Sequence, residues 1–214
     1  MTRNQIARGS ARAPWVLAAV VLVAVTAMVT SRVVSDEKGE PPAMNEEMQK
    51  MMEAYAKAST PGEHHKHLGK LVGTWSEKSK FWMEPGGEPT EGKATATWKP
   101  LFEGRYVMLN YKGDSPMGPF EGIGITGYDN MTKKYVDVWI DSMSTAIMSS
   151  TGTCDAAGRV YNYIGDGIDP ITQQKKTIRS VVRMVSDTEM HFEMFDKTPE
   201  GKEFRNLEII YSKK

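Results

Sequence analysis

Short runs in which apolar and polar residues alternate occupy the chain from residue 74 to its last residues. The clearest run is YVDVWID at Tyr135–Asp141, where one face is aliphatic and the other mixes two aromatic residues with two carboxylates. The two faces consist of Val136, Val138 and Ile140, and of Tyr135, Asp137, Trp139 and Asp141. Because side chains alternate sides along a strand, this period of two predicts a β-strand with two chemically distinct faces.

Ten runs of this kind are predicted as strands, separated by turn segments such as EPGGEP, GDSPMG, DAAG and KTPEGK. Their ranges are 74–82, 92–98, 105–111, 120–128, 135–141, 145–154, 160–165, 176–185, 190–196 and 204–212. Strands at this spacing without intervening helices favour an antiparallel meander. Because ten strands in an open sheet would leave two edges unpaired, we predict an all-β fold, an up-and-down barrel over residues 74–214.

The residues before the barrel predict two short helices. In the segment 44–59, four methionines and Tyr55 recur at spacings of three and four, which indicates an amphipathic helix. This methionine face is expected to pack against the barrel, and a partner-binding face is the alternative. Thr60, Pro61 and Glu63 are typical of a helix start, with Thr60 as the N-cap, and Gly73 is suited to end that helix. Residues 44–73 are therefore expected to form a helical cap over one mouth of the barrel.

The first residues predict a membrane signal. Nineteen uncharged residues, mostly Val, Ala and Leu, lie between Arg12 and Arg32, and about 20 apolar residues span a bilayer as a helix. Three arginines precede this run, so the positive-inside rule leaves the N-terminus in the cytoplasm and exports the rest. Residues 1–35 are thus expected to be a cytoplasmic n-region with a transmembrane anchor, or a signal peptide cleaved near Ala27. Residues 36–43, DEKGEPPA, are expected to be an extended linker.

Charge and cysteine content exclude several classes of function. Residues 1–35 hold four arginines and no acid, which leaves 23 basic against 27 acidic residues in the remainder of the chain. A mildly acidic domain without a basic stripe argues against nucleic acid as a partner. The single cysteine, Cys154, has no second cysteine to pair with and is expected to be a buried structural thiol.

Several motifs resemble known families. LVGTW at Leu71–Trp75 is similar to the Gly-x-Trp signature of lipocalins and related calycin barrels. In those proteins the tryptophan closes the barrel floor under a basic residue from the last strand. Here Gly73 and Trp75 would provide this closure, with Lys213 or Arg205 as the basic partner.

A further set of motifs, in order along the chain, resembles a bacterial family known as domain of unknown function 1579. These motifs are TPGEHHK at Thr60, GTW at Gly73, FEG at Phe120, GYDN at Gly127, WIDSM at Trp139 and GKEF at Gly201. The resemblance implies a calycin-like β-barrel of lipocalin or fatty-acid-binding size and brings no known activity. For a bacterial protein, the predicted signal places the domain on the periplasmic side of the inner membrane, or outside the cell if the signal is cleaved.

The mixed face of residues 135–141 supplies the first ligand-binding hypothesis. If it faces the barrel interior, the cavity has aromatic walls and a few fixed polar groups, as small-molecule sites commonly do. The alternative is that the aliphatic face forms the core, and alternation alone leaves both open. Arg179 and Arg183 share a strand face and could hold a ligand carboxylate if that face is internal, or pair with Glu193 or Glu208 if it is not. The candidate ligand-binding residues are Trp139, Asp141, Asp137, Tyr111, Glu121, Arg179 and Arg183.

Catalytic and metal chemistry have weaker support. Glu121 and Asp141 are the two carboxylates that could perform acid–base chemistry, which makes an enzyme of unknown reaction the main alternative to a binding protein. His64 and His67 share a helix face and are weak candidates for metal ligands. His191 is an isolated strand histidine with an expected structural role. We expect no metal and no cofactor.

The sequence therefore favours an exported, membrane-tethered barrel that binds a small, partly apolar ligand, with the N-terminal helix in contact with the membrane. An enzyme or an interaction module of the cell envelope is the alternative. The identity of the ligand and the oligomeric state do not follow from the sequence.

Overall fold

A computed structural model describes residues 45–115, 118–169 and 172–214. The chain divides into two units, Met1–Glu46 and Glu47–Lys214, and the described part belongs almost wholly to the second. The predicted membrane signal and linker lie outside the described residues. Among the helices in the described ranges, none has the length and apolar character to cross a membrane.

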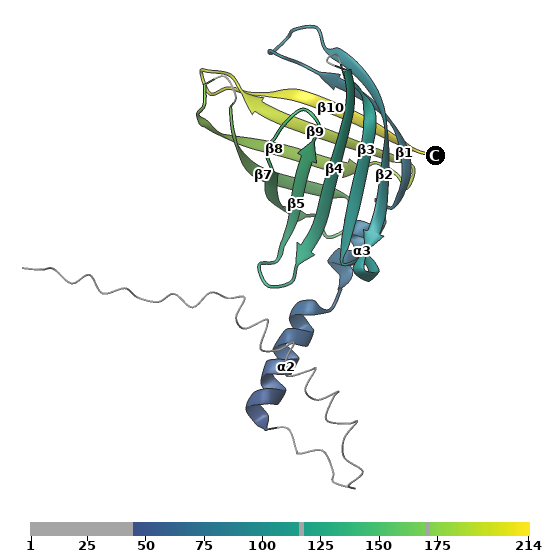
Figure 1. Ribbon diagram of the computed structural model, residues 1–214, viewed down its shortest axis with the longest axis vertical. Coiled ribbons are helices and arrows are strands. Elements are labelled where there is room, and N and C mark those ends of the chain that lie inside the picture. Colours follow the sequence, from purple (N-terminus) through teal and green to yellow (C-terminus); the bar gives the residue numbers. More distant parts are fainter. Residues whose placement is uncertain (1–44, 116–117, 170–171) are drawn as a thin grey trace, which may run out of the picture. The chain divides into compact units, whose positions relative to one another are not determined.

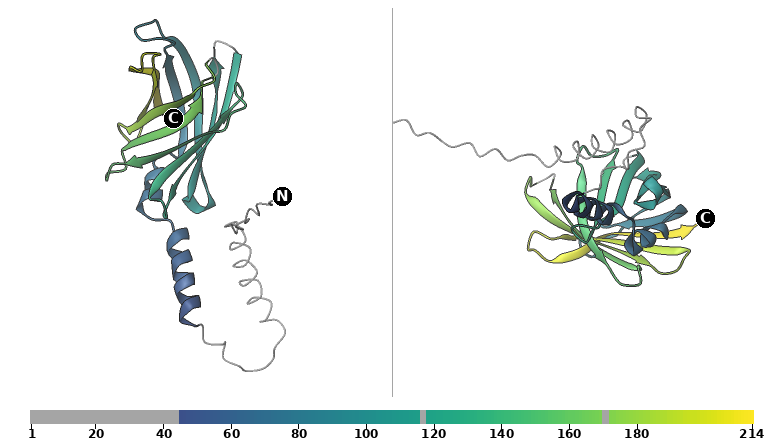
Figure 2. Two further views of the ribbon diagram at one scale, coloured as in Figure 1. Left: turned by 90° about the vertical axis from the view of Figure 1, so that its left-hand side faces the viewer. Right: turned by 90° about the horizontal axis from the view of Figure 1, so that it is seen from below.

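The ten predicted strands are all present and form one closed antiparallel barrel (Figure 1). They are β1 (Gly73–Phe81), β2 (Thr90–Leu101), β3 (Tyr106–Ser115), β4 (Gly118–Asp129), β5 (Lys134–Asp141), β6 (Met148–Cys154), β7 (Val160–Ile168), β8 (Lys175–Met184), β9 (Glu189–Lys197) and β10 (Glu203–Lys213). Each strand pairs with the next along the chain, and β1 pairs with β10 to close the barrel (Figure 2). A short 3₁₀ turn, η2 (Phe102–Gly104), joins β2 to β3.

Two helices precede the barrel, as predicted: α2 (Glu46–Ser59) and α3 (Glu63–Gly69). The predicted end of the second helix at Gly73 is wrong, because α3 ends at Gly69 and Gly73 begins β1. The predicted role of Thr60 as the N-cap of the second helix is wrong, because Gly62 occupies that position. The Thr60 hydroxyl instead donates to the Ala56 carbonyl oxygen at 2.6 Å, satisfying a carbonyl at the end of α2. At the N-cap of α3, the Gly62 amide donates a hydrogen bond to the Nδ1 atom of His65 at 3.0 Å.

The expectation that the methionine face of α2 packs against the barrel is not met, since no residue of α2 is buried. Met52 and Tyr55 remain 48% and 44% exposed. The C-terminal end of α2 contacts the barrel through Asn130, whose Nδ2 atom donates to the Ala58 oxygen at 3.0 Å. The partner-binding alternative for α2 therefore stays open.

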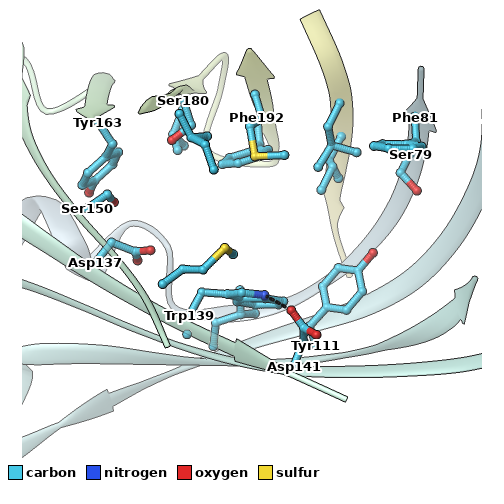
Figure 3. A pocket seen from close by; sticks show the side chains of 18 of the residues that line it. Ser79, Phe81, Tyr111, Asp137, Trp139, Asp141, Ser150, Tyr163, Ser180 and Phe192 are labelled. Atoms are coloured by element: carbon cyan, nitrogen blue, oxygen red, sulfur yellow. Dashed lines mark hydrogen bonds between the residues drawn. The ribbon is translucent and has the colours of Figure 1, made fainter. Parts of the chain in front are cut away.

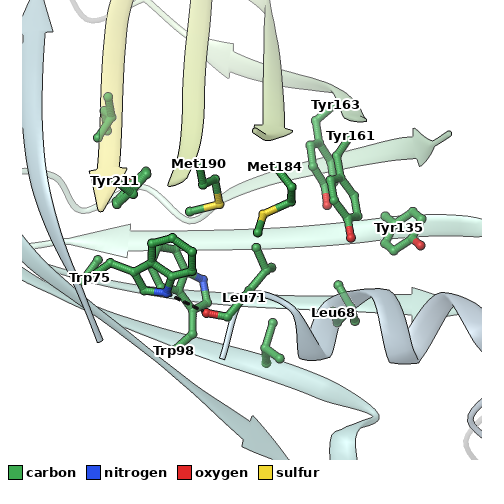
Figure 4. Packing of buried hydrophobic residues seen from close by; sticks show 13 residues of the cluster. Leu68, Leu71, Trp75, Trp98, Tyr135, Tyr161, Tyr163, Met184, Met190 and Tyr211 are labelled. Atoms are coloured by element: carbon green, nitrogen blue, oxygen red, sulfur yellow. Dashed lines mark hydrogen bonds between the residues drawn. The ribbon is translucent and has the colours of Figure 1, made fainter. Parts of the chain in front are cut away.

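The core gathers where α3 meets the barrel (Figure 4). Leu68 and Leu71 enter a cluster with the fully buried Trp75, whose indole nitrogen donates to the Leu71 carbonyl oxygen at 2.9 Å. The Lys213 ammonium lies 5.1 Å from the Trp75 ring centroid, so Lys213 is the basic partner. Arg205 lies instead over Trp82, at 5.0 Å from its ring centroid.

Candidate functional site

The barrel encloses a cavity of about 870 Å³, and all ten strands contribute to its lining. Strand alternation explains the arrangement, because residues two apart on each strand project to the same side. The lining is dominated by aromatic residues, methionines and aliphatic residues, with serine, threonine and carboxylate groups among them. A volume of this size lies within the usual range of small-molecule sites.

The mixed face of β5 lines this cavity, which settles the question that alternation left open. Asp137, Trp139 and Asp141 belong to the lining, whereas Val138 and Ile140 face outward. The neighbouring strand makes room for the large indole, since Gly124 is the direct register partner of Trp139. A Cβ atom added at Gly122 would come within 2.2 Å of the Trp139 ring, so the backbone there forms part of the indole's packing surface.

Two aromatic rings contact the indole on this wall. The Phe120 and Trp139 rings are stacked with centroids 6.3 Å apart, and Tyr111 contacts both edge to face at 5.6 and 6.1 Å. Such arrangements suit the ring quadrupoles and hold the side chains in defined positions. Rings of β7 and β9, Tyr163 and Phe192, face this wall from across the cavity (Figure 3).

Asp141 is held in place by local hydrogen bonds. Its Oδ2 atom accepts from the Trp139 indole nitrogen at 2.9 Å, shown by the dashed line in Figure 3. Its Oδ1 atom accepts from the Met143 amide at 2.9 Å. The two bonds fix the carboxylate beside the aromatic wall and orient the indole as well.

Asp137 lies farther along the same face of β5 and has fewer partners. Its Oδ2 atom accepts a hydrogen bond of 2.6 Å from the Thr126 hydroxyl. Burial raises the pKa of Asp137 to about 6, and the Thr126 hydrogen bond offsets part of that increase. Burial and the negative charge of Asp137 also raise the pKa of the Tyr163 hydroxyl. Asp137 thus lies in an environment that disfavours its charged form.

A third carboxyl group, Glu77, is buried on the interior face of β1 and was not among the predicted site residues. It is 2% exposed, and neither of its oxygens has a hydrogen-bond partner in the described part of the chain. Burial raises its pKa, and the nearby Ser79 and Tyr111 hydroxyls act in the opposite direction. Its position between Trp75 and Ser79 on an alternating strand was a signal that could have identified it.

The predicted site residues separate into two groups. Trp139, Asp141, Asp137 and Tyr111 line the cavity, and the other three do not: Glu121, Arg179 and Arg183. Glu121 forms an exposed ion pair with Lys112 at 2.8 Å. Thr126, Ser150, Tyr163 and Ser180 line the cavity without having been predicted, although each lies on an alternating strand.

The two arginines lie on the outer side of β8, and each forms an ion pair with a glutamate. Arg179 binds Glu203 through two hydrogen bonds of 3.0 and 2.7 Å and lies over the Phe195 ring. Arg183 pairs with Glu193 at 3.2 Å. Neither arginine is placed to hold a ligand carboxylate inside the barrel, because the cavity-facing positions of β8 are Ile178, Ser180 and Val182.

The enzyme alternative loses its carboxylate pair for a similar reason. Gly122 is the register partner of Asp141, so Glu121, one residue earlier, projects to the opposite side of the wall. Cys154 offers no nucleophile either, because burial, followed by the charge of Asp155, raises the pKa of its thiol to about 11. His191 lies outside the cavity lining, with its Nε2 atom 2.7 Å from Glu189.

The histidines of α3 contact tyrosines of the barrel. The Nδ1 atoms of His64 and His67 lie 3.1 and 3.3 Å from the Tyr135 hydroxyl oxygen. The His64 ring also stacks on Tyr128, with centroids 4.1 Å apart. In the described ranges no group of three potential ligand side chains is placed to hold a metal ion. The two histidines act here as packing and hydrogen-bonding partners of the barrel.

Similar solved structures are β-barrels. The crystal structure of Rv2717c from M. tuberculosis superposes with a TM-score of 0.55 at 11% sequence identity, covering 72% of this chain and 99% of that chain. At this identity the likeness shows the fold alone. A de novo designed fluorescence-activating β-barrel superposes with a TM-score of 0.39 at 14% identity, covering 69% of this chain and 96% of that chain. This TM-score is too low for conclusions about the present chain.

No curated protein matches the sequence. A family model described as "Protein of unknown function (DUF1579)" matches residues 60–213, which include α3 and nearly the whole barrel. The chain therefore belongs to the DUF1579 family of β-barrel proteins.

Proposed function

We propose that this protein binds a small, partly apolar molecule inside its barrel. The observation that carries the proposal is the cavity of about 870 Å³, which side chains leave unfilled and which aromatic and methionine side chains surround. A barrel whose only role was structural would be expected to fill its interior to the density of a protein core. Fixed polar groups, such as the Asp141 carboxylate that accepts a hydrogen bond from the Trp139 indole, can orient a specific ligand.

We further propose that the barrel performs this role outside the cytoplasm, attached to the membrane by residues 1–35. The support for this location is the apolar run at 13–31 with its flanking arginines. A tethered binding domain would hold its ligand near the membrane surface. Fractionation of cells that express the full chain, followed by protease treatment of spheroplasts, distinguishes an anchored from a released protein.

Native mass spectrometry tests the binding proposal directly. The full chain is purified from its own host, and its mass is compared with the sequence mass before and after organic extraction. We expect a reproducible small-molecule adduct that extraction removes. A chain that carries no adduct and binds nothing from a host metabolite extract would contradict the proposal.

A matched pair of variants distinguishes cavity binding from surface binding. Ser180→Phe places a ring inside the cavity, whereas Ser76→Phe places the same ring on an exposed position of β1. We expect the adduct to disappear from the first variant and to persist in the second. Equal loss from both variants would show that the molecule is held elsewhere.

A further inference from the structure

The charges of the cavity lining are all of one sign. Among the described residues, the lining contains five carboxylates and no lysine, arginine or histidine. The five are Glu91, Asp114, Asp137, Asp141 and Asp166. A cavity built for fatty acids or other anions would be expected to present an arginine or lysine to the ligand carboxylate. This cavity presents the opposite charge.

The ion pairs of the barrel do not neutralise the inner carboxylates. Glu91 pairs with Lys80 at 3.8 Å and Asp166 with Lys175 at 2.8 Å, both with substantially exposed side chains. Asp137, by contrast, has no ion-pair partner in the described part of the chain. An ionised carboxylate can accept about four hydrogen bonds, and Asp137 accepts one, from Thr126.

Lys176 and Lys213 lie on the inner side of the barrel near the ends of their strands, and neither belongs to the cavity lining. Lys176, two residues before the lining residue Ile178, is bound by Asp196 at 2.6 Å and Asp169 at 3.5 Å. Lys213 lies over Trp75, where the α3 residues close the core. These two lysines, held by Asp196 and Asp169 and by the Trp75 ring, thus leave Asp137 without a cationic partner among the described residues.

The remaining surroundings of Asp137 suit a cation with an apolar body. Trp139 lies on the same face of β5 as Asp137, and Tyr163 and Phe192 face this wall from across the cavity (Figure 3). Faces of aromatic rings attract positive charge, most strongly where water is excluded. An unpaired buried carboxylate is costly, and a ligand cation would remove that cost on binding.

We infer that the ligand is an organic cation, an amine or ammonium group on an aromatic or aliphatic body, and that Asp137 is its counter-ion. This inference rests on the proposed function, since it specifies the charge of the molecule that the cavity holds. Asp141, fixed by the Trp139 indole and the Met143 amide, is a second acceptor on the same face of β5. Free carboxylates and phosphates are excluded as ligands by the same arrangement.

The test compares three probes that share a naphthalene body: 1-naphthylmethylammonium, 1-naphthylmethanol and 1-naphthoate. The full chain is held in zwitterionic phosphatidylcholine nanodiscs, and binding is measured by titration calorimetry with empty nanodiscs as the blank. We expect the ammonium probe to bind at least about tenfold more tightly than the alcohol, and naphthoate to bind weakest. Naphthoate binding as tightly as the ammonium probe would overturn the inference while leaving the proposed function intact.

Two isosteric variants assign the preference to one carboxylate. Asp137→Asn is expected to bring the ammonium probe within about threefold of the alcohol and leave the alcohol's affinity unchanged. Asp187→Asn, in the exposed turn between β8 and β9, is expected to change neither. A tenfold preference that survives Asp137→Asn would reject Asp137 as the counter-ion. If none of the probes binds, and the Ser180→Phe variant retains the same small-molecule adduct as the wild type, both the inference and the proposed function fail.

Discussion

At the scale of single residues, the interior of this barrel combines rings that stabilise it with carboxylates that do not. Asp137 and Glu77 both have raised pKa values because burial disfavours their charged forms. Residues that reduce stability in this way are commonly found where a protein interacts with a ligand. Stability alone would favour neutral side chains at both positions.

Asp137→Asn is predicted to change the pH dependence of stability. The pKa of Asp137 is about 6 in the folded protein against an ordinary value of 3.8, so the folded state binds more protons than the unfolded state between these values. The free energy of unfolding contributed by Asp137 therefore falls as pH rises from about 4 to 6. Removing the charge should raise the free energy of unfolding at pH 7.5 by about 3 kcal/mol and leave it nearly unchanged at pH 4.

Urea unfolding of the two proteins at pH 4 and pH 7.5 measures this effect. The groups that face Asp137 from neighbouring strands are Thr126 on β4, Ser150 on β6 and Tyr163 on β7. The first two do not titrate, and Tyr163 has a pKa raised above its ordinary value, so none contributes a transition in this interval. A stability difference that is the same at both pH values would contradict the assignment.

At the scale of elements, β4 and β5 show how the cavity wall is built. The inward positions of β4 include Gly122 and Gly124, and β5 places Trp139 against this bare backbone. The indole then lies along the wall and leaves the volume in front of it open. Without the glycines the ring would have to project into the cavity.

Gly122→Ala is accordingly predicted to displace Trp139. The added Cβ atom would approach the indole to 2.2 Å, a distance that requires the ring or the strand to move. We expect a loss of about 1–3 kcal/mol in the free energy of unfolding, typical of overpacking, and weaker binding of any cavity ligand. The fluorescence contributed by Trp139, taken as the difference from a Trp139→Phe variant, should shift as the ring moves. Gly69→Ala is the control, since Gly69 is exposed at the end of α3 and a Cβ atom there meets nothing within 4 Å.

The elements also show how far sequence reasoning reaches. Strand number and pairing follow from period-two alternation and turn residues, because every run finds its partner in the next one along the chain. The inward face of β5 did not follow, since the aliphatic and the mixed face both satisfy alternation. The side-chain partners of Arg179 and of Asp137 lie on other strands, Glu203 on β10 and Thr126 on β4. Local patterns contain no information about such pairs.

At the scale of the whole molecule, the described residues comprise a barrel with α3, which share a buried core, and α2, which contributes no buried residue. The barrel and α3 share one core, in which Leu68 is completely buried and Leu71 accepts the Trp75 hydrogen bond. The helix α2 buries no residue. The family match also begins at residue 60, after α2. Residues 60–214 should therefore contain everything that the barrel needs for its stability.

Three truncated chains test this division. The chain 60–214 is predicted to lose no more than about 1 kcal/mol of unfolding free energy relative to 45–214, because Asn130 loses hydrogen bonds to Lys57 and Ala58 but keeps the one to Thr60. The chain 73–214 also lacks Leu68 and Leu71, and is predicted to lose about 4 kcal/mol or more, as expected when buried leucines are removed. Urea unfolding followed by tryptophan fluorescence measures all three. If removing α2 proves as costly as removing α3, then α2 packs against the barrel in solution and is not available to a partner.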